Sequence, residues 1–340
     1  MRVTMRDVAE HAGVSVKTVS RVVNLEPHIR PEMVQRVRAA IEELGWVPNG
    51  SARALRTGRT GVVGIAVAEL RRPYLAGLVE ALVTEADRRG MQAAVEPTHR
   101  DPENVHAVLD ARGRTFDGVV LIGDDDATAV VPDGLGERPV VAVQAPRISG
   151  AVDHVAEDVA DAATLIARHL AVMGRAHPAI LGPDRARTPG EPGSAPSAAM
   201  RSALFAAGFD VDSVQHVPLG GTWDRRAGQQ AAADVLHRHP GVDSLICVND
   251  EVALGALASL AAAGVDVPGQ VAVVGYDNLD DGWFSTPSLT TIDPGREPLA
   301  RAALDLLADR LSGQASAHAR SAVVPVRLVR RESTLGAGAT

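Results

Sequence analysis

Residues 6–24 read RDVAEHAGVSVKTVSRVVN, and this stretch sets the organisation of the N-terminal part of the chain. Thr4 and Asp7 have the spacing of an N-cap hydroxyl and a carboxylate three residues later, which predicts the start of a helix. Gly13 is placed to end this helix, and Ser15 is placed to cap a second one. The order predicts two short helices joined by a turn that contains glycine.

The apolar residues of this stretch recur at helical spacing, which predicts one inward face on each helix. They are Val8, Ala9 and Ala12 in the first helix and Val19, Val22 and Val23 in the second. On the outward side of the second helix, Val16 lies one turn before Ser20. Lys17 likewise lies one turn before Arg21. A helix-turn-helix of this kind can place its second helix in the major groove of DNA, and the same pattern also fits a plain solvated hairpin.

The outward side chains have chemistry that suits a duplex. Lys17 and Arg21 can donate to guanine edges or phosphates, and Val16 can contact a thymine methyl. Short polar residues anchor phosphate oxygens. The predicted DNA contacts in this part are Thr4, Ser15, Val16, Lys17, Thr18, Ser20, Arg21 and Asn24. Lys17 is the only lysine among 34 basic residues, which indicates either a place where a guanidinium does not fit or a general bias towards arginine.

The charge is distributed unevenly along the 340 residues. Residues 1–60 hold ten basic and six acidic residues, a balance of +4, whereas residues 61–340 hold 24 and 36, a balance of −12. The two add up to the net charge of −8. A basic head on an acidic body is typical of a chain whose one end binds phosphate.

Composition favours a globular protein of the cytoplasm. Hydrophobic residues make up 46% and charged residues 22%, and the single cysteine, Cys247, excludes an internal disulfide framework. No signal peptide and no run of eighteen apolar residues is present, so we expect no contact with a membrane. Enzyme motifs such as a phosphate-binding Gly-rich loop with lysine or a His-Glu-x-x-His zinc pattern are missing. We therefore expect no enzyme activity, no metal and no cofactor.

Two further segments complete the N-terminal part. Pro31 opens a third helical pattern that continues to about Leu44. Residues 45–61, GWVPNGSARALRTGRTG, then contain a short helical patch at 51–55. Five residues cannot hold a helix alone in water, so this patch is expected to fold only against a partner.

Strand-like and helix-like patterns alternate from residue 61 onwards, which predicts an α/β body of doubly wound parallel sheets in two similar lobes. The strand patterns are 61–69, 91–98, 116–123 and 139–146, followed by 178–183, 213–221, 243–250 and 271–277. In such folds ligands bind beyond the carboxyl ends of the strands.

Four stretches, in order and along nearly the whole chain, resemble the LacI/GalR family of bacterial transcriptional regulators. They are DVAEHAGVSVKTVSRVVN (7–24), VPNGSARALRTGRT (47–60), VNDEVALGA (248–256) and VGYDN (274–278). The resemblance implies a three-helix DNA-binding head that binds a palindromic double-stranded operator as a homodimer. It also implies that a hinge helix orders on the operator and that Leu55 wedges into the minor groove. Ala52 is then the small residue beside this wedge, and Asn49 is a further DNA contact.

The resemblance also implies a two-lobed, periplasmic-binding-protein-like body that holds a sugar-like effector. The implied domains are the head (1–48), the hinge (49–60) and the effector-binding and dimerisation domain (61–340). The N-lobe is expected at about 61–160 and 291–320, and the C-lobe at about 161–290 and 321–335. The chain would thus cross between lobes near residues 160, 290 and 321.

The implied effector-binding residues follow or end predicted strands, or open a helix. They are Tyr74, Asp158, Trp223, Asn249 and Asp277. Carboxylates and amides bind vicinal hydroxyls, and an indole covers the apolar face of a sugar ring. One position departs from the family, because Pro196 stands where an arginine is usual, and Arg185 or Arg187 are the candidates to replace it.

Together these features predict a cytoplasmic, nucleoid-associated transcription factor, a repressor of carbohydrate genes, that responds to a small molecule. The alternative with the same body fold is an exported sugar-binding receptor for transport. The DNA-binding head and the missing signal peptide argue against that alternative. The effector, the operator and the direction of the response stay open.

Overall fold

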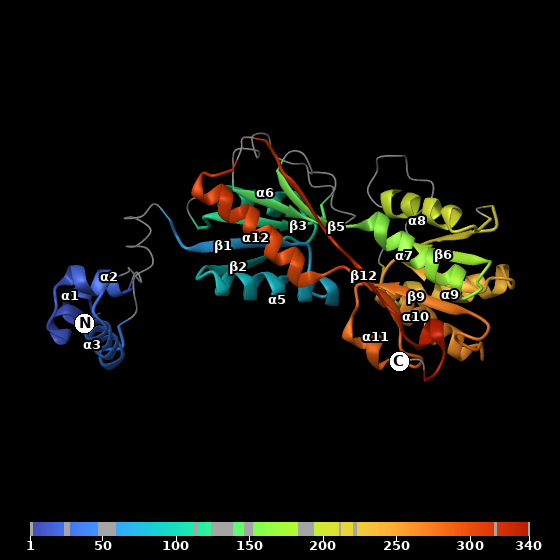
Figure 1. Cartoon of the computed structure of the whole chain (residues 1–340), viewed down its shortest axis with the longest axis horizontal. Coiled ribbons are helices and arrows are strands. Elements are labelled where there is room, and N and C mark those ends of the chain that lie inside the picture. Colours follow the sequence, from blue (N-terminus) through green and yellow to red (C-terminus); the bar gives the residue numbers. More distant parts are fainter. Residues whose placement is uncertain are drawn as a thin grey trace. The chain divides into compact units, whose positions relative to one another are not determined.

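The chain forms two compact units, Met1–Gly61 and Val62–Thr340 (Figure 1). The structure is a computed structural model, and the residues that it describes are 3–23, 28–46, 59–111, 115–123, 139–145, 152–182, 194–210, 212–219, 223–315 and 318–338. Among these residues, the first unit contains three short helices, and the second contains two six-stranded sheets.

The expected helix-turn-helix is confirmed in the first unit. Helix α1 spans Met5–Ala12, α2 spans Val16–Val23 and α3 spans Pro31–Glu43. Thr4 and Asp7 form the expected capping box: the Thr4 N–H donates to Asp7 Oδ2 at 2.7 Å, and the Asp7 N–H donates to Thr4 Oγ1 at 3.4 Å. Gly13 ends α1 with φ 60°, a left-handed conformation that glycine adopts without strain.

The three helices share one small core. Val8, Val19 and Val37, one from each helix, are fully buried. Trp46 covers this core after the end of α3 and is also buried. Arg36 of α3 donates through Nη2 to the carbonyl oxygen of Ala12 at 2.5 Å, which satisfies a carbonyl that the end of α1 leaves without a helical partner.

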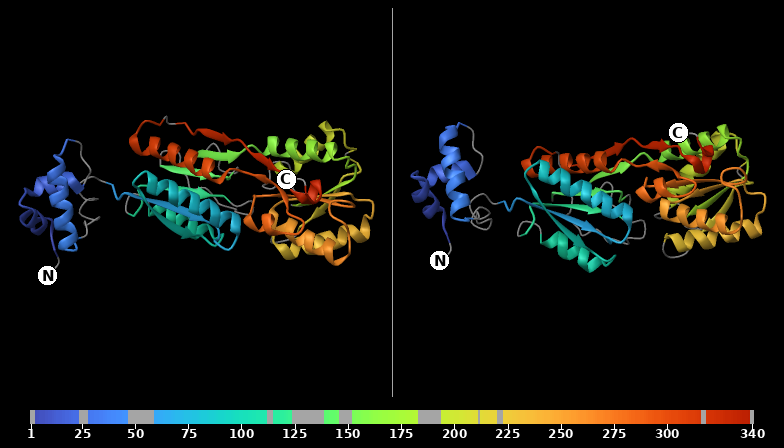
Figure 2. Two further views of the ribbon diagram at one scale, coloured as in Figure 1. Left: turned by 60° about the horizontal axis from the view of Figure 1, so that its bottom comes forward. Right: turned by 90° about the horizontal axis from the view of Figure 1, so that it is seen from below.

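The N-lobe sheet has the strand order β11-β5-β4-β3-β1-β2. Its strands are β1 Val62–Val67, β2 Gln92–Pro97, β3 Gly118–Ile122, β4 Val140–Val143, β5 Asp153–Glu157 and β11 Ser321–Val324. All of its pairings are parallel. Helices α5 (Pro73–Arg88) and α12 (Arg296–Ser312) lie side by side over one face, and α6 (Pro102–Asp110) covers the other (Figure 2).

The C-lobe sheet repeats this design with the order β12-β10-β9-β8-β6-β7. Its strands are β6 Pro178–Gly182, β7 Gln215–Pro218, β8 Ser244–Cys247, β9 Ala272–Tyr276, β10 Thr290–Asp293 and β12 Arg327–Val329. Only the pairing of β10 with β12 is antiparallel among the described strands of this sheet.

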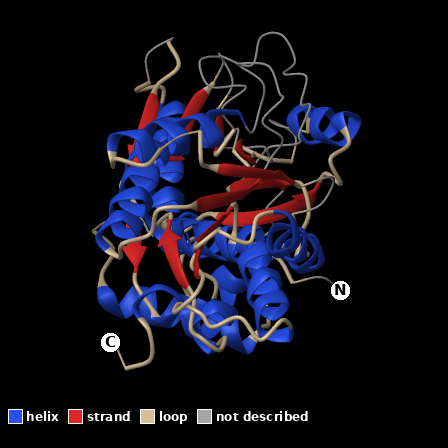
Figure 3. Ribbon diagram, turned by 90° about the vertical axis from the view of Figure 1, so that its right-hand side faces the viewer, coloured by secondary structure: helices blue, strands red, loops and turns tan. Residues whose placement is uncertain are grey.

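Helices cover both faces of the C-lobe sheet (Figure 3). Helices α7 (Val159–Val172) and α8 (Ser194–Ala206) pack on one face, and α9 (Arg225–Arg238) and α10 (Asp250–Ala262) pack on the other. Two short helices, α11 (Asp280–Phe284) and α13 (Glu332–Leu335), follow β9 and β12. The predicted two-lobed fold of doubly wound parallel sheets is therefore confirmed.

Two of the expected lobe boundaries need correction. Residues 291–293 were expected in the N-lobe, but they belong to β10, which pairs with β9 in the C-lobe sheet. Residues 321–324 were expected in the C-lobe, but they form β11, which pairs with β5 in the N-lobe sheet. The chain passes between the lobes after β5, β10 and β11 (Figure 1). Each of these strands pairs within the sheet of its own lobe, and the chain then continues into the other lobe.

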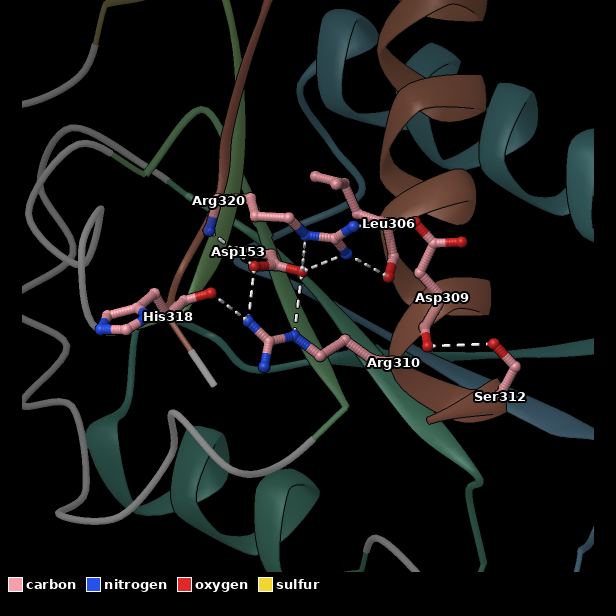
Figure 4. A network of polar contacts seen from close by, with 7 residues as sticks. All are labelled: Asp153, Leu306, Asp309, Arg310, Ser312, His318 and Arg320. Atoms are coloured by element: carbon pink, nitrogen blue, oxygen red, sulfur yellow. Dashed lines mark hydrogen bonds and ion pairs between the residues drawn. The ribbon is translucent and has the colours of Figure 1, made fainter. Parts of the chain in front are cut away.

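A buried ion network joins three segments of the N-lobe (Figure 4). The Asp153 carboxylate, at the start of β5, has no exposed surface. Arg310 of α12 donates to it through Nε and Nη2 at 3.0 and 2.7 Å. Arg320, next to β11, donates through its backbone N–H and through Nη2, both at 2.8 Å. The carboxylate thus fixes the entry of β5 and β11 against the end of α12.

The protonation of Asp153 follows from these contacts. Burial by itself raises the pKa of the carboxyl group, but the hydrogen bonds from Arg310 and Arg320 outweigh burial and lower the pKa to about 2. The folded-state pKa therefore lies below the ordinary value of 3.8. The network stabilises the fold at every pH above that value, and its contribution is lost as the pH falls towards 2.

Replacing Asp153 by asparagine leaves two arginines without their counter-charge in the interior. We expect Asp153→Asn to lower the free energy of unfolding by about 3–5 kcal/mol at pH 7, measured by urea titration. The difference from wild type should shrink between pH 3.8 and pH 2. Asp309→Asn is the matched control, since Asp309 pairs with Arg320 at the surface and should cost less than about 1 kcal/mol. Equal losses in the two variants would refute the role of the network.

Candidate functional sites

The first candidate site is the outward side of α2. Val16 is 43% exposed and Lys17 is exposed, whereas Val19 and Val22 face the core. Ser20 and Arg21 are half-buried on the same helix, one turn further on. An eight-residue helix with one face exposed in this way has the dimensions to lie in a major groove.

Three of the predicted DNA contacts also have a local structural role. Thr4 caps α1, as described above. Ser15 accepts a hydrogen bond from the Thr18 N–H at 3.1 Å, and the two hydroxyls of Ser15 and Thr18 are 2.9 Å apart. These hydrogen bonds satisfy the first turn of α2 and fix the hydroxyls at its N-terminus, the end of a helix that favours phosphate. The other predicted contacts, Asn24, Asn49, Ala52 and Leu55, lie outside the described residues.

The second candidate site is at the carboxyl ends of β8 and β9, which are neighbours in the C-lobe sheet. Asn249 follows β8, and Asp277 follows β9 directly. Asn249 is buried and uses both ends of its amide: Oδ1 accepts from the Val252 N–H at 2.8 Å, and Nδ2 donates to the Trp223 carbonyl at 3.0 Å. Asn249 therefore caps α10 and holds the backbone of Trp223, whose side chain packs partly buried on the C-lobe core.

Asp277 has no comparable support. Its residue is 8% exposed, and no hydrogen bond or ion pair from the described residues reaches its carboxylate. Burial raises its pKa well above the ordinary value, the Asp250 carboxylate adds to this effect, and the Arg72 charge opposes it. Its backbone adopts φ 115°, a conformation that costs energy for any residue with a side chain. Residues with a strained backbone and a strongly shifted pKa gather at functional sites.

Asp250 lies beside Asp277 and was not singled out from the sequence. Its carboxylate is fully buried and accepts from the Thr291 hydroxyl at 2.6 Å and from the Leu279 N–H at 2.7 Å. Burial nevertheless raises its pKa to about 7. Asp250 thus holds the loop after β9 in place and adds negative charge behind Asp277.

A hydrogen bond joins the two lobes at this place. The Tyr276 hydroxyl, at the end of β9, donates to Glu157 Oε1 at 3.3 Å, and Glu157 is the last residue of β5 in the N-lobe sheet. Gln144, directly after β4, donates through Nε2 to Glu157 Oε2 at 2.7 Å. Glu157, Gln144 and Tyr276 were not among the predicted site residues. Gln144 lies inside the predicted strand 139–146 and follows the observed β4 directly, so its place at a strand end emerged only from the structure, and β5 itself was not predicted.

Tyr74, the second residue of α5, faces the same group of residues. Its hydroxyl is buried and has no hydrogen-bond partner among the described residues. The Gln144 amide lies near Tyr74 and also donates to Glu157. Burial and the carboxylates of Glu157 and Asp277 raise the pKa of Tyr74 well above 10. Tyr74, Glu157, Tyr276 and Asp277 thus form one cluster, which we call the interlobe cluster.

Asp158 has a structural contact of its own. Its carboxylate accepts from the Asp161 N–H at 2.9 Å and caps α7, and its own N–H donates to the Val324 carbonyl at 2.9 Å. It lies at the first passage between the lobes, next to Glu157. The replacement candidates Arg185 and Arg187 lie outside the described residues.

Other kinds of site find little support in the described part of the chain. No group of three or more histidine, cysteine, aspartate or glutamate side chains there could hold a metal ion. None of the described helices combines the length and the apolar character that crossing a bilayer requires. The Cys247 thiol is buried and its pKa is raised by burial, so it is not a reactive nucleophile.

Known proteins match the chain along its length. Residues 4–49 match the family described as bacterial regulatory proteins, lacI family, and residues 167–334 match the periplasmic binding protein-like domain. The lactose operon repressor of Escherichia coli K12 is 30% identical over 342 residues, which are 98% of this chain and 91% of the relative.

Two solved structures extend the comparison. The lac repressor dimer bound to operator and the anti-inducer ONPF has a TM-score of 0.79 at 26% identity, and the match covers 98% of this chain and 99% of that one. The complex of the transcriptional regulator CelR with cellobiose has a TM-score of 0.66 at 28% identity, covering 98% and 100%. With the exposed α2 helix in a three-helix head and polar residues at the carboxyl edges of two sheets, these matches establish that the chain belongs to the LacI family of bacterial regulatory proteins.

Proposed function

We propose that this LacI-family chain is a ligand-controlled transcriptional repressor that binds a palindromic operator as a homodimer. The observation that carries the proposal is the exposed side of α2, with Val16 and Lys17 outward and Val19 inward. The basic charge is concentrated in the head, which is the part that would contact DNA phosphates, whereas the body is acidic. A DNA-binding head has no function in an exported sugar-binding receptor. The fold therefore favours the DNA-binding regulator.

The hinge is part of the proposal. Residues 49–60 connect the head to the body, and Asn49, Ala52 and Leu55 are proposed to contact the minor groove at the centre of the operator. The regulator acts on DNA in the nucleoid, without catalysing a reaction. Its relatives are regulators and not enzymes by name.

The body is proposed to bind a sugar-like effector at the interlobe cluster. Tyr276 and Glu157 join the two lobes there, and Asp277, Asn249 and Trp223 come from neighbouring segments of the C-lobe. A ligand that contacts both lobes favours one arrangement of them. Since the head and the body are one chain, this preference changes the operator affinity by linkage. The lac repressor structure holds the anti-inducer ONPF and the CelR structure holds cellobiose, and the second of these ligands supports a saccharide.

The first test concerns the head. Operator binding, measured by fluorescence anisotropy on a duplex selected from random sequences, should weaken steeply with salt as counterions are released. Lys17→Ala and Arg21→Ala should each cost about 1–3 kcal/mol on this duplex and relax its sequence preference. Arg38→Ala is the control, because it removes the same charge from an exposed position on α3. Equal losses on selected and random DNA would show that both side chains contact phosphates only.

The second test concerns the body. Asp277→Ala should leave operator binding in the absence of effector within about threefold of wild type, because the head is a separate compact unit. The same variant should lose the effect of the effector on operator affinity. The effector is found by a thermal-shift screen of sugars, sugar phosphates and nucleosides, since a ligand at 100 times its Kd adds about 2.7 kcal/mol of stability. A variant that unfolds, or that responds to effector like wild type, would refute the assigned role.

A further inference from the structure

One apolar side chain of the C-lobe is packed into the core of the N-lobe. Leu279 lies between β9 and α11, in the C-lobe part of the sequence, and is 3% exposed. It belongs to the apolar core that β1, α5 and α12 form in the N-lobe. All the other described members of that core come from residues 63–155 and 299–324. Among the described residues, Leu279 is therefore the one that the C-lobe contributes to the N-lobe core.

The main chain around Leu279 is held by the C-lobe. The Leu279 N–H donates to Asp250 Oδ2 at 2.7 Å. Its neighbour Asn278 accepts through Oδ1 from Arg331 Nη2 at 2.8 Å, and the Asp277 N–H donates to a carbonyl oxygen of β10 at 2.9 Å. Each residue of the segment 277–279 thus has a hydrogen bond to the C-lobe, so the segment moves with that lobe.

The packing of Leu279 depends on how the two lobes are arranged. Side chains in a protein core interdigitate closely, so a rotation of one lobe against the other has to withdraw or repack this leucine. The hydrogen bond between Tyr276 and Glu157 crosses the same junction, but at 3.3 Å it is longer than the usual O–H···O distance of about 2.7–2.8 Å. A long hydrogen bond adds little net free energy, which makes the buried leucine the stronger of these two contacts.

Leu279 also lies two residues after the proposed effector contact, Asp277. Asp277 and Asn278 have φ values of 115° and 51°, in the left-handed region that residues with a side chain rarely adopt. Such a conformation persists only where the surrounding structure holds it. The residue that packs into the N-lobe is therefore connected to the proposed effector contact by a short, strained segment.

We propose that Leu279 is a positioning residue, which fixes the arrangement of the two lobes by packing into the N-lobe core and thereby sets the operator affinity. This inference rests on the proposed function, since operator affinity is one of its readouts. A contact that is made in one lobe arrangement and lost in another shifts the population of the two, and the operator affinity follows by linkage.

The first test measures the lobe arrangement of the full chain without a ligand, by double electron–electron resonance. Spin labels are attached at Ala107→Cys on α6 and Ala233→Cys on α9, two exposed positions, one in each lobe. Cys247 is buried and burial raises the pKa of its thiol, so it stays unlabelled. An excess of unlabelled chain ensures that most labelled dimers carry one labelled copy.

Leu279→Ala should shift or broaden the distance distribution between the two labels, because the contact that selects one arrangement is removed. Leu279→Met keeps a similar apolar volume and should restore the wild-type distribution. Leu279→Val removes less of the side chain and should give a smaller change than Leu279→Ala, and it keeps the test possible if the alanine variant does not fold.

Leu82→Ala is the matched control. Leu82 is fully buried in the same apolar core, but both its main chain and its side chain belong to the N-lobe. This variant should lower the thermal stability at least as much as Leu279→Ala and leave the distance distribution unchanged. A wild-type distribution in Leu279→Ala, or equal broadening in Leu82→Ala, would overturn the proposal.

The second test measures operator binding without effector, by fluorescence anisotropy on the selected duplex. The Kd of Leu279→Ala should differ from wild type by at least about fivefold, a typical size for coupling between sites. Leu82→Ala should stay within about twofold of wild type, because its core lies apart from the head.

The outcomes separate this inference from the proposed function. A changed distance distribution with an unchanged operator Kd would refute the link between Leu279 and operator affinity, and DNA binding by the head would stand. Wild-type protein that binds no operator would refute the proposed function itself. The distance measurements would still decide whether Leu279 fixes the lobe arrangement.

Discussion

Apart from β12, which is antiparallel to β10, the strands of each sheet pair in parallel and point the same way, so these parallel strands end at a common edge. Residues that directly follow different strands are then brought together, although they are far apart in the sequence. In the C-lobe this places Asn249 near Asp277, and in the N-lobe it places Gln144 near Glu157. The hydrogen bond between Tyr276 and Glu157 joins these two edges. The interlobe cluster forms because, in both sheets, the residues that follow parallel strands meet at one edge.

Three buried aspartates show how the surroundings decide what a carboxylate does. Asp153 is held by two arginines, which lower its pKa to about 2, and it serves the fold. Asp250 is held by neutral donors, which do not offset burial, and its pKa rises to about 7. Asp277 has neither kind of partner among the described residues. The first two are held by partners within the protein, and the third is the one that we propose for the effector.

The two units of the chain divide the work of a regulator. The head has a small core of its own, closed by Trp46, and α2 contributes Val19 and Val22 to that core while Val16 and Lys17 stay exposed on its other side. The body carries the three passages between its lobes, after β5, β10 and β11. Two of these strands, β5 and β11, lie side by side, and Asp153 holds the beginning of both. The two passages that follow them therefore start from strands whose position is fixed.

Features that depend on residues close together in the sequence could be predicted from the sequence alone. The capping box joins Thr4 and Asp7, three residues apart, and the inward faces of α1 and α2 follow from a helical period, so neither depends on the rest of the fold. The eight predicted strands are apolar runs bounded by turn residues, and each was found close to its predicted range. Asn249 and Asp277 could be named because the resemblance to the family points to them and they lie at the ends of such runs.

Long-range pairing was decided only by the tertiary structure. Strands β5, β10, β11 and β12 were not predicted, because their sequences DHVAE, TTID, SAVV and RLV mix polar with apolar residues and become strands by pairing with a neighbour. Asp153 meets Arg310 across 157 positions, and Tyr276 meets Glu157 across 119. A carboxylate in a sequence looks the same whether it caps a helix, as Asp158 does, or has its pKa raised by burial, as Asp277 does. The difference is set by burial and by partners, and only the folded chain supplies them.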